Sequence, residues 1–409
     1  MQSIGAIKKR PASTLNPGKV QTPAFVIEED LLKHNLERLQ YVSDMAGCTI
    51  LLAMKAWATW PLFGMVKKYL SGVEVSSLNE ARLGFEEFGQ KVHIYSPAYK
   101  PEEFHEILKN CSHVIFNSFA QWRQFRRTVK DFSRKNKKNI ECGLRINPEM
   151  SFGEGEDMYN PCAVDSRLGV RLSEFEKALA EDPKVMDGLS GIHFHIFFER
   201  DEQDLEKALY HIEKRFGKYL KQLKWVNFGG GQKITDDNYD VEALIRLIKN
   251  FKKKYGVEVH LEPGAAVVWQ SGTLVASVLD IIESEDVPYS IAILDISFEA
   301  HLTDFMLTPS LNLRVRGAVE GRENKYVYQF GGCSCLAGDR REQLYSFSQK
   351  LKVGDRVVFE DGIQYSLVKT TMFNGIQHPD IVLWKKIGKE YAAKRIRKFE
   401  YEDFKKRMG

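Results

Sequence analysis

The sequence predicts an α/β protein, in which a closed (β/α)8 barrel of the TIM type is followed by an all-β C-terminal domain. Three observations lead to this fold class. The chain has 409 residues, more than the roughly 250–300 residues that one hydrophobic core usually supports. Eight short strand-like runs alternate with segments of helical spacing, and after Gly264 the alternation gives way to successive strand-like runs separated by turn residues.

The strand-like runs of the first half are rich in β-branched and aromatic residues. They cover residues 49–55, 73–77, 92–96, 113–118, 141–147, 191–196, 225–230 and 257–263. In the segments between them, apolar residues recur at intervals of three and four, as on one face of a helix. Parallel strands need such helical crossovers, and eight of them close into a barrel. An open doubly wound sheet is the alternative architecture.

The two sequence regimes define the expected domains. We expect the barrel over residues 25–270 and the β domain over residues 271–384, with residues 1–24 joining the β domain. Residues 385–409 form a basic tail with ten Lys or Arg and four Asp or Glu, which we expect to be a helix with a solvated face. An arm that binds anions or nucleic acid is the alternative, but the rest of the chain carries no basic excess, so no nucleic-acid partner is expected.

Composition excludes several classes of protein. The net charge is +4, with 43% hydrophobic and 28% charged residues, as in ordinary globular proteins. No apolar run approaches the roughly 18–20 residues of a membrane span, and the N-terminus lacks the apolar stretch of a secretory signal. Six scattered cysteines do not make a disulfide framework, so we expect a cytoplasmic protein. The absence of zinc-finger spacing predicts no metal site.

Lys55 ends the otherwise apolar run TILLAM. Polar residues follow the other barrel strands as well, and the carboxyl ends of such strands build the active site in this fold. Burial at a strand end would lower the pKa of a lysine and make it a nucleophile able to form a Schiff base. A salt-bridged lysine is the alternative interpretation.

Two further strand ends carry chemistry. Gly229, Gly230 and Gly231 follow the run WVNF, where backbone N–H groups can approach a phosphate, although a tight turn alone would also use glycine. Glu262 of LEPG could pair with a protonated pyridine nitrogen or cap a helix. With Lys55, these are the parts that a pyridoxal-phosphate enzyme needs.

The chain resembles a known family over almost its whole length. The motifs that carry the resemblance are TPAFVIEEDLL, LLAMKAWA, VEVSSLNEARLG, VHIYSPAY, VIFNS, GLRINPE, SRLGV, GIHFHIFFE, WVNFGGG, LEPG, LVASVLDII, EAHLTD, CLAGD and VKTTMFNG. In order and spacing they are similar to those of the barrel-type pyridoxal-phosphate decarboxylases, the group with alanine racemase and the ornithine and diaminopimelate decarboxylases. The nearest branch acts on carboxynorspermidine and carboxyspermidine.

The resemblance implies roles for residues of the cofactor site. Lys55 would hold pyridoxal 5′-phosphate as a Schiff base, and His195 would stack on its ring. Glu262 would pair with the pyridine nitrogen. Residues 229–231 and Tyr365 would hold the phosphate. His193 is expected to point the opposite way from His195 and to be structural.

The resemblance also implies how the substrate is handled. Cys335 looks like the decarboxylase cysteine that one subunit of a homodimer offers to the other, where it or Lys55 would return a proton to the product. Asp339, Glu299, Asp304 and His301 would bind a cationic polyamine. The implied reaction gives norspermidine or spermidine and carbon dioxide. The alternatives are a decarboxylase for another basic amino acid and a non-catalytic pyridoxal-phosphate protein.

Three departures from the family pattern lie near the expected substrate channel. Ala265 stands after LEPG, where the family usually has an acidic residue or an arginine. Thr303 replaces the usual proline of EAHMPD, and Phe197 and Phe198 stand where smaller groups are common. We therefore expect intact cofactor chemistry, while these departures leave open which amine is the substrate.

Overall fold

The structure is a computed structural model and describes residues 9–150, 152, 160–163, 165–283 and 285–409. The chain forms two compact units. One contains Leu36–Val267, and the other contains Arg10–Asn35 together with Val268–Gly409. Residues 1–8, which the sequence assigns to the β domain, lie outside the described residues.

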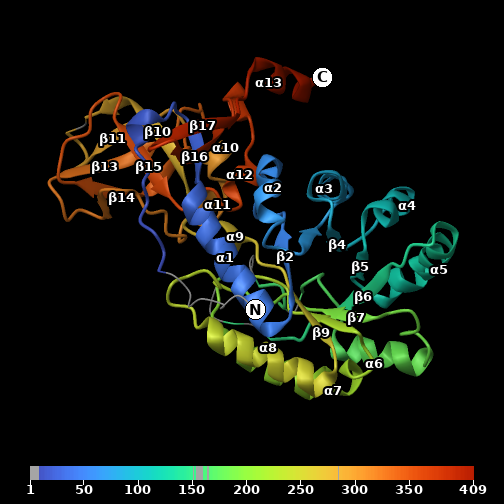
Figure 1. Ribbon diagram of the computed structural model, residues 1–409. Helices are drawn as coiled ribbons and strands as arrows, with labels where there is room; N and C mark the ends of the chain where they lie inside the picture. The colour runs from blue at the N-terminus through green and yellow to red at the C-terminus, as the bar shows by residue number, and fades with distance from the viewer. Residues whose placement is uncertain (1–8, 151, 153–159, 164, 284) are drawn as a thin grey trace. The chain divides into compact units, whose positions relative to one another are not determined.

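The first unit is a barrel of eight parallel strands (Figure 1). The strands are β2 Thr49–Ala53, β3 Gly72–Val75, β4 Lys91–Tyr95, β5 His113–Phe116, β6 Glu141–Arg145, β7 Gly191–His193, β8 Trp225–Asn227 and β9 Glu258–Leu261. Each strand pairs with the next, and β9 pairs with β2, so the sheet is closed. The predicted barrel is confirmed, and the open-sheet alternative is wrong.

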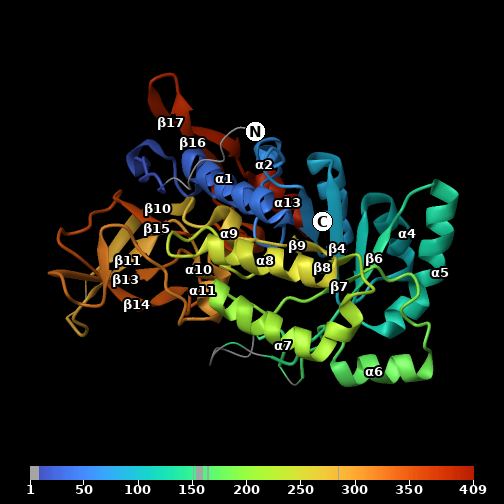
Figure 2. The same ribbon diagram turned by 60° about the horizontal axis from the view of Figure 1, so that its bottom comes forward.

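Helices cover the outside of this barrel, as Figure 2 shows for the longer ones. The helices are α2 Phe63–Val66, α3 Leu78–Leu83, α4 Pro101–Asn110, α5 Phe119–Asn136, α6 Leu172–Glu181, α7 Glu202–Leu220, α8 Val241–Tyr255 and α9 Ala265–Val268. Side chains cap several helix starts, since Ser118, Asp201 and Asp240 each accept a bond from a backbone N–H in the first turn. These caps begin the crossovers directly after the strands and so fix the loops at the carboxyl ends.

The second unit is a nine-stranded sheet. Its strands are β1 Ala24–Glu28, β10 Gly272–Ile282, β11 Ser290–Leu294, β12 Ala318–Glu320, β13 Tyr326–Gly331, β14 Arg340–Phe347, β15 Arg356–Glu360, β16 Asp380–Ile387 and β17 Glu390–Arg397. Eight of them lie in the order β12-β14-β13-β11-β10-β1-β16-β17, and β15 pairs with β10. The helices are α10 Phe298–His301, α11 Thr303–Leu307, α12 Ser366–Lys369 and α13 Tyr401–Met408, while the residues of α1 Glu29–Ala46 are divided between the two units after Asn35. Single turns lie at Pro17–Lys19, Trp60–Leu62, Gly84–Phe88 and Phe373–Gly375.

Two segments differ from the sequence-based expectation. Residues 25–28 were expected in the barrel domain, but β1 pairs with β10 and β16 of the second sheet, with all five of its residues buried. The basic tail was expected to be helical, but it continues β16 into an antiparallel hairpin with β17, and only α13 is helical. Gly388, with a φ of +66°, makes the tight connection that a helix could not accommodate.

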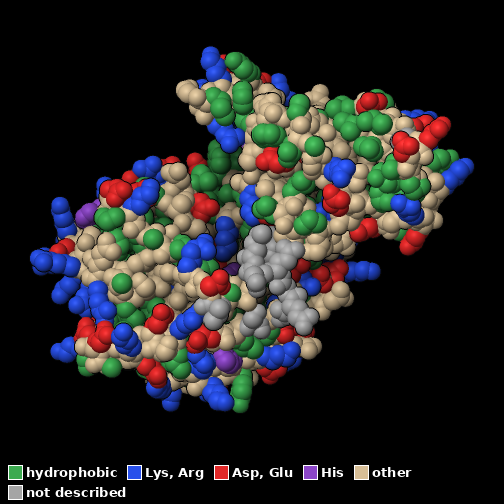
Figure 3. All heavy atoms as spheres, turned by 180° about the vertical axis from the view of Figure 1, so that it is seen from behind, with side chains coloured by type: hydrophobic (Ala, Val, Ile, Leu, Met, Phe, Trp, Pro, Cys, Tyr) green, Lys and Arg blue, Asp and Glu red, His purple; other side chains and the backbone are tan. Residues whose placement is uncertain are grey.

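Charged side chains of both signs are interspersed over the face that Figure 3 shows. Among the residues that the structure describes, no helix is both long and apolar enough to cross a membrane.

Candidate active site

Lys55 and Glu262 lie at the same end of the barrel. Lys55 follows β2 and Glu262 follows β9, and both are therefore at the carboxyl ends of neighbouring strands. The backbone N–H of Ala53 donates to the carbonyl oxygen of Pro263 over 3.1 Å, which holds the LEPG turn against the residues before Lys55. The Lys55 side chain is half-buried, and its charge is close enough to lower the pKa of Glu262.

The Glu262 carboxylate is buried and fully engaged. One oxygen accepts from Nδ2 of Asn227 over 2.6 Å, and the other lies 3.1 Å from Nε2 of His193. Burial alone would raise the pKa of Glu262, but these bonds and the charge of Lys55 outweigh it, so the pKa lies below its ordinary value. Glu262 is therefore a carboxylate at neutral pH.

His193 belongs to this site, contrary to the expectation that it would be structural and point away. Residues two apart in a strand face the same side, and the ring of His193 faces Glu262 inside the barrel. Burial lowers the pKa of His193 more than Glu262 raises it, so the ring is neutral and donates its Nε2 proton to the carboxylate. This bond orients Glu262 and stabilises its charge.

Glu74 of β3 is a second buried carboxyl that sequence reasoning missed. Burial, with the nearby charge of Glu262, raises the pKa of Glu74 to about 8. One of its oxygens has no hydrogen-bond partner among the described residues. Glu74 therefore holds a proton at neutral pH while Glu262 does not. A charged residue in the middle of the buried run VEV is the signal that could have revealed it.

The glycine run lies against neighbouring backbone. A Cβ at Gly230 would stand 2.2 Å from the carbonyl oxygen of Glu262, and one at Gly231 would stand 2.0 Å from that of Phe197. Gly229 and Gly231 have φ of +68° and +86°. Only glycine satisfies both the contacts and the backbone angles here.

His195 is tied to the glycine run. Its Nδ1 accepts from the backbone N–H of Gly230 over 2.9 Å, so the ring proton is on Nε2. Burial, followed by the charges of Lys55 and Arg145, holds the pKa of His195 well below its ordinary value. Arg145, which sequence reasoning also missed, donates to the carbonyl oxygen of His195 over 3.1 Å and lies 4.5 Å from the ring centroid of Tyr95.

The remaining predicted residues lie in the second unit. Asp339 is buried, and its carboxylate accepts the backbone N–H groups of Phe298, Glu299 and Ser334 over 2.6, 3.1 and 3.1 Å. These bonds cap α10 and fix the turn before Cys335. In this structure the Asp339 carboxylate holds the backbone of these two segments, which differs from its expected role as a ligand of a substrate amine.

Glu299 and Asp304 differ in their partners. One carboxylate oxygen of Glu299 is buried without a hydrogen-bond partner among the described residues, whereas Asp304 forms an ion pair with Lys369. His301 is fully buried, and its Nδ1 accepts from the backbone N–H of Ser297 over 3.2 Å. Burial lowers the pKa of His301 to about 4, so its ring is neutral. Glu299 is the carboxylate that is best prepared to accept a bond from an amine.

Cys335 and Tyr365 lie on irregular segments of the same unit. Cys335 is exposed, and its backbone N–H donates to Oδ1 of Asn374 over 2.9 Å. Tyr365 is half-buried before α12 with a φ of +57°, and Lys369 Nζ lies 5.4 Å from its ring centroid. The six cysteines, all among the described residues, are free thiols.

The residues that depart from the family pattern are accommodated locally. Thr303 donates from its hydroxyl to the carbonyl oxygen of Glu299 over 3.0 Å, which fixes the segment between α10 and α11. Phe197 is buried, with its ring centroid 5.4 Å from that of Phe152, whereas Phe198 is exposed. Ala265 begins α9.

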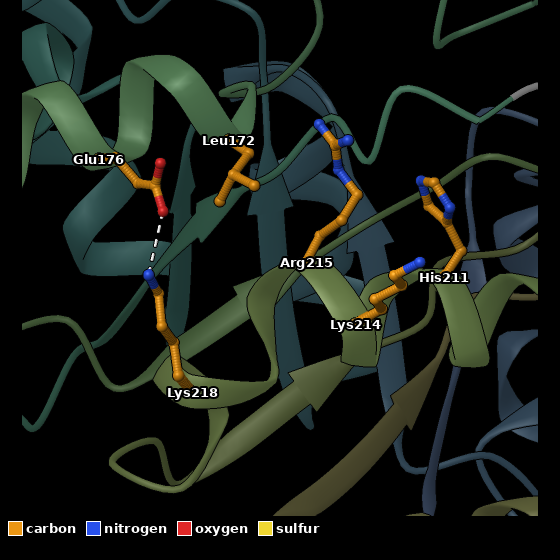
Figure 4. A pocket seen from close by; sticks show the side chains of 6 residues that line it. All are labelled: Leu172, Glu176, His211, Lys214, Arg215 and Lys218. Atoms are coloured by element: carbon orange, nitrogen blue, oxygen red, sulfur yellow. Dashed lines mark hydrogen bonds and ion pairs between the residues drawn. The ribbon is translucent and has the colours of Figure 1, made fainter.

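Two surface hollows lie on the barrel unit. One lies over the carboxyl ends of β3 and β4 and includes Ser76, Ser77 and Ser96 among its lining residues. The other lies between α6 and α7 on the outside of the barrel (Figure 4). There Lys218 is paired with Glu176, and Arg215 with Glu149, so these two cations are neutralised within the chain.

Comparisons with known proteins give a consistent result. The family described as "Pyridoxal-dependent decarboxylase, C-terminal sheet domain" matches residues 30–362. The chain is 43% identical to a carboxynorspermidine/carboxyspermidine decarboxylase of Campylobacter jejuni, over 94% of this chain and 98% of the relative. It is 41% identical to a carboxyaminopropylagmatine decarboxylase of Synechocystis, over 95% of each chain. The crystal structure of the carboxynorspermidine decarboxylase of Campylobacter jejuni with norspermidine superimposes with a TM-score of 0.83 at 42% identity, covering 95% of this chain and all of that one.

Proposed function

Because the chain belongs to the family of pyridoxal-dependent decarboxylases, we propose that it removes the carboxylate of carboxynorspermidine or carboxyspermidine. The products are norspermidine or spermidine and carbon dioxide, so the enzyme acts in polyamine biosynthesis. The observation that carries the decarboxylase chemistry is the buried, ionised Glu262 beside Lys55 at the carboxyl ends of the strands.

The residues present fit pyridoxal phosphate. Glu262 offers a negative charge to a protonated ring nitrogen. The run from Gly229 to Gly231 has no side chains that would keep a phosphate away from its backbone N–H groups. Lys55 supplies the amine that an aldehyde requires. We propose that these residues hold the cofactor, with His195 against its ring and Tyr365 at its phosphate.

Charge explains why this site favours decarboxylation. Pyridoxal phosphate, when bound, supplies an electron sink for the pair left at Cα after carbon dioxide departs. Glu262 keeps a proton on the ring nitrogen because its own pKa is low, and His193 and Asn227 hold the carboxylate in place. Glu74 stays neutral beside it, which avoids a second buried negative charge.

The chain also provides groups that can return a proton to Cα. Lys55 is an amine at the site, and Cys335 carries an exposed thiol in the second unit. We propose that Cys335 delivers this proton. The backbone bonds of Asp339 and Asn374 hold the segment on which the thiol lies.

Recognition of the amine end rests on Glu299. Its buried oxygen without a partner among the described residues would accept a bond from a substrate ammonium group, and a charge-assisted bond of this kind is worth more than a neutral one. Asp304 and His301 of the same motif complete the proposed pocket. Asp304 would have to exchange its ion pair with Lys369.

Carboxyaminopropylagmatine is the second candidate substrate. The relative that acts on it is nearly as similar to this chain as the carboxynorspermidine enzyme. Its guanidinium group would form two bonds with Glu299 where an ammonium group forms one. A simpler diamino acid such as ornithine or diaminopimelate is the remaining alternative.

The test is a panel of substrates given to the purified holoenzyme. Carboxynorspermidine, carboxyspermidine, carboxyaminopropylagmatine, ornithine and diaminopimelate are supplied separately, and release of carbon dioxide is measured. We expect the highest kcat/KM with the first two. Turnover of ornithine or diaminopimelate alone would overturn the proposal, and no turnover with any substrate would leave a non-catalytic cofactor-binding protein.

We further propose that the enzyme is a cytoplasmic homodimer in which each subunit lends Cys335 to the site of its partner. Lys55→Ala and Cys335→Ala proteins should each be inactive alone. Refolded together in equal amounts, they should recover about a quarter of wild-type activity, because half of the molecules are mixed dimers with one intact site. The absence of recovery would contradict shared sites.

A further inference from the structure

Three histidines meet inside the barrel in a region that the proposed reaction does not use. His93 is the third residue of β4, His113 is the first residue of β5, and His260 is the third residue of β9. One ring nitrogen from each lies within 4.8 Å of those from the other two. His93 and His113 face each other across paired strands, which explains how residues far apart in sequence converge.

Polar atoms of this cluster lack partners. Neither ring nitrogen of His93 has a hydrogen-bond partner among the described residues, and the same is true of Nδ1 of His260. His93 is fully buried and His260 is 4% exposed. Since most buried polar atoms are hydrogen-bonded, the unpartnered nitrogens of these two rings are available to a ligand, and an ion would take one nitrogen from each ring. Nδ1 of His113 is bonded to the Ser112 hydroxyl over 3.0 Å, which leaves Nε2 of His113 for that occupant.

The three rings are neutral, which is the state that ligates metals. Burial lowers the pKa of His113 to about 4 and that of His260 to about 3. The pKa of His93 is held well below its ordinary value by burial and then by the other two rings. At neutral pH the cluster presents lone pairs and no positive charge.

We propose that His93, His113 and His260 form a binding site for a divalent transition-metal ion, with zinc favoured. Three imidazole nitrogens suit zinc better than the hard cations calcium or magnesium, which prefer oxygen. Glu141 at the start of β6 is paired in register with His113 and lies close enough for its charge to affect both His113 and His260. A water molecule would complete the coordination, because Oε1 of Glu141 already accepts from Asn139 and Lys224.

Metal binding requires a defined rearrangement. The rings of His93 and His113 are stacked, with centroids 3.7 Å apart and planes 20° apart, so their lone pairs do not yet converge. Tetrahedral zinc with bonds of about 2.0–2.1 Å needs ligand nitrogens about 3.3 Å apart, and the widest present separation must close by at most about 1.5 Å. This closure would require one ring to rotate out of the stack. His113 is half-buried and provides the side from which an ion would enter.

The ion would be structural. It would join the adjacent strands β4 and β5 to β9, which is not a neighbour of either strand in the barrel. Beside it, Trp225 occupies the space left by Gly143 and Gly191, where added Cβ atoms would stand 2.2 and 2.1 Å from its ring. The metal would thus tighten a part of the barrel interior that otherwise holds only packed rings.

The test measures metal binding directly on the holoenzyme after dialysis against a chelator. Zinc content per chain is determined, and cobalt is titrated while its visible absorption is followed. Wild-type protein is compared with His93→Gln, His113→Gln and His260→Gln. His105→Gln is the matched control, because His105 is exposed on α4. Folding is checked by circular dichroism and by the absorbance of the bound cofactor. X-ray absorption spectroscopy of the zinc-loaded wild-type protein reports the ligand atoms without relying on any variant.

We expect one zinc ion per chain in the wild-type and His105→Gln proteins, a rise in Tm on zinc addition, and imidazole scattering in the absorption spectrum. Each cluster variant should lose stoichiometric binding. The proposal is overturned if the wild-type protein binds no metal at micromolar concentrations, if the cluster variants bind as well as the control, or if the spectrum shows sulfur ligands. None of these outcomes depends on decarboxylase activity.

Discussion

Replacement of Glu262 by glutamine removes one charge and little volume from the proposed active site. The carboxylate would otherwise form a charge-assisted bond to the protonated ring nitrogen of the cofactor. A hydrogen bond that involves a charged group is worth about 1.5–3 kcal/mol. Because about 1.36 kcal/mol corresponds to a tenfold change in rate, kcat should fall by about 10- to 150-fold.

The surrounding contacts define how the variant should behave. The glutamine oxygen can still accept from Asn227, and His193 can move its proton to Nδ1 to accept from the glutamine amide, so the fold should persist. Steady-state kinetics on carboxynorspermidine measures kcat and KM, with Glu258→Gln as control, since Glu258 is exposed at the opposite end of β9. A variant with unchanged kcat and an intact cofactor spectrum would refute the assignment of Glu262.

Three further predictions concern neighbouring features. The pKa of Glu74 is about 8, so the folded protein holds a proton that the unfolded chain releases above pH 4.5. Stability should therefore fall as pH rises from 4.5 to 8, and urea unfolding of Glu74→Gln at pH 6 and pH 8 should show a smaller fall than the wild type. Gly230→Ala should lose the cofactor and lower Tm, because its Cβ would meet the carbonyl oxygen of Glu262 at 2.2 Å, whereas Gly64→Ala, with nothing within 4 Å, should retain cofactor absorbance. Glu299→Gln should raise KM about 10-fold or more with kcat nearly unchanged, since a charged bond is lost; an unchanged KM would remove Glu299 from the substrate pocket.

The barrel could be predicted because its strands and helices carry different hydrophobic periods. Strands β2 to β9 are short and buried on both faces, whereas α5, α7 and α8 are amphipathic and capped. The partners of β1 could not be predicted, since an apolar run fixes a strand but not its neighbours. The prediction of a helical tail was wrong because the basic charge pattern does not distinguish a helix from a hairpin, whereas Gly388 marks the turn of a hairpin.

At the site, sequence reasoning found the residues that follow strands, but among those within strands it missed Glu74 and Arg145 and gave His193 only a structural role. Lys55 ends an apolar run and Glu262 precedes the turn residues Pro263 and Gly264, so both polar residues are conspicuous in the sequence. Glu74, His193 and Arg145 lie inside strands, and their roles depend on which side chains meet across the barrel interior. The histidine cluster was missed for the same reason, since zinc-finger spacing detects only ligands that are close in sequence.

In the proposed mechanism, Lys55 is the residue that carries the cofactor. Reduction of the holoenzyme with borohydride, followed by proteolysis and mass spectrometry, fixes the cofactor to the lysine that holds it. We expect the pyridoxyl group on Lys55 and loss of the near-visible absorbance band in Lys55→Ala. Labelling of any other lysine, or a band that survives in Lys55→Ala, would contradict it.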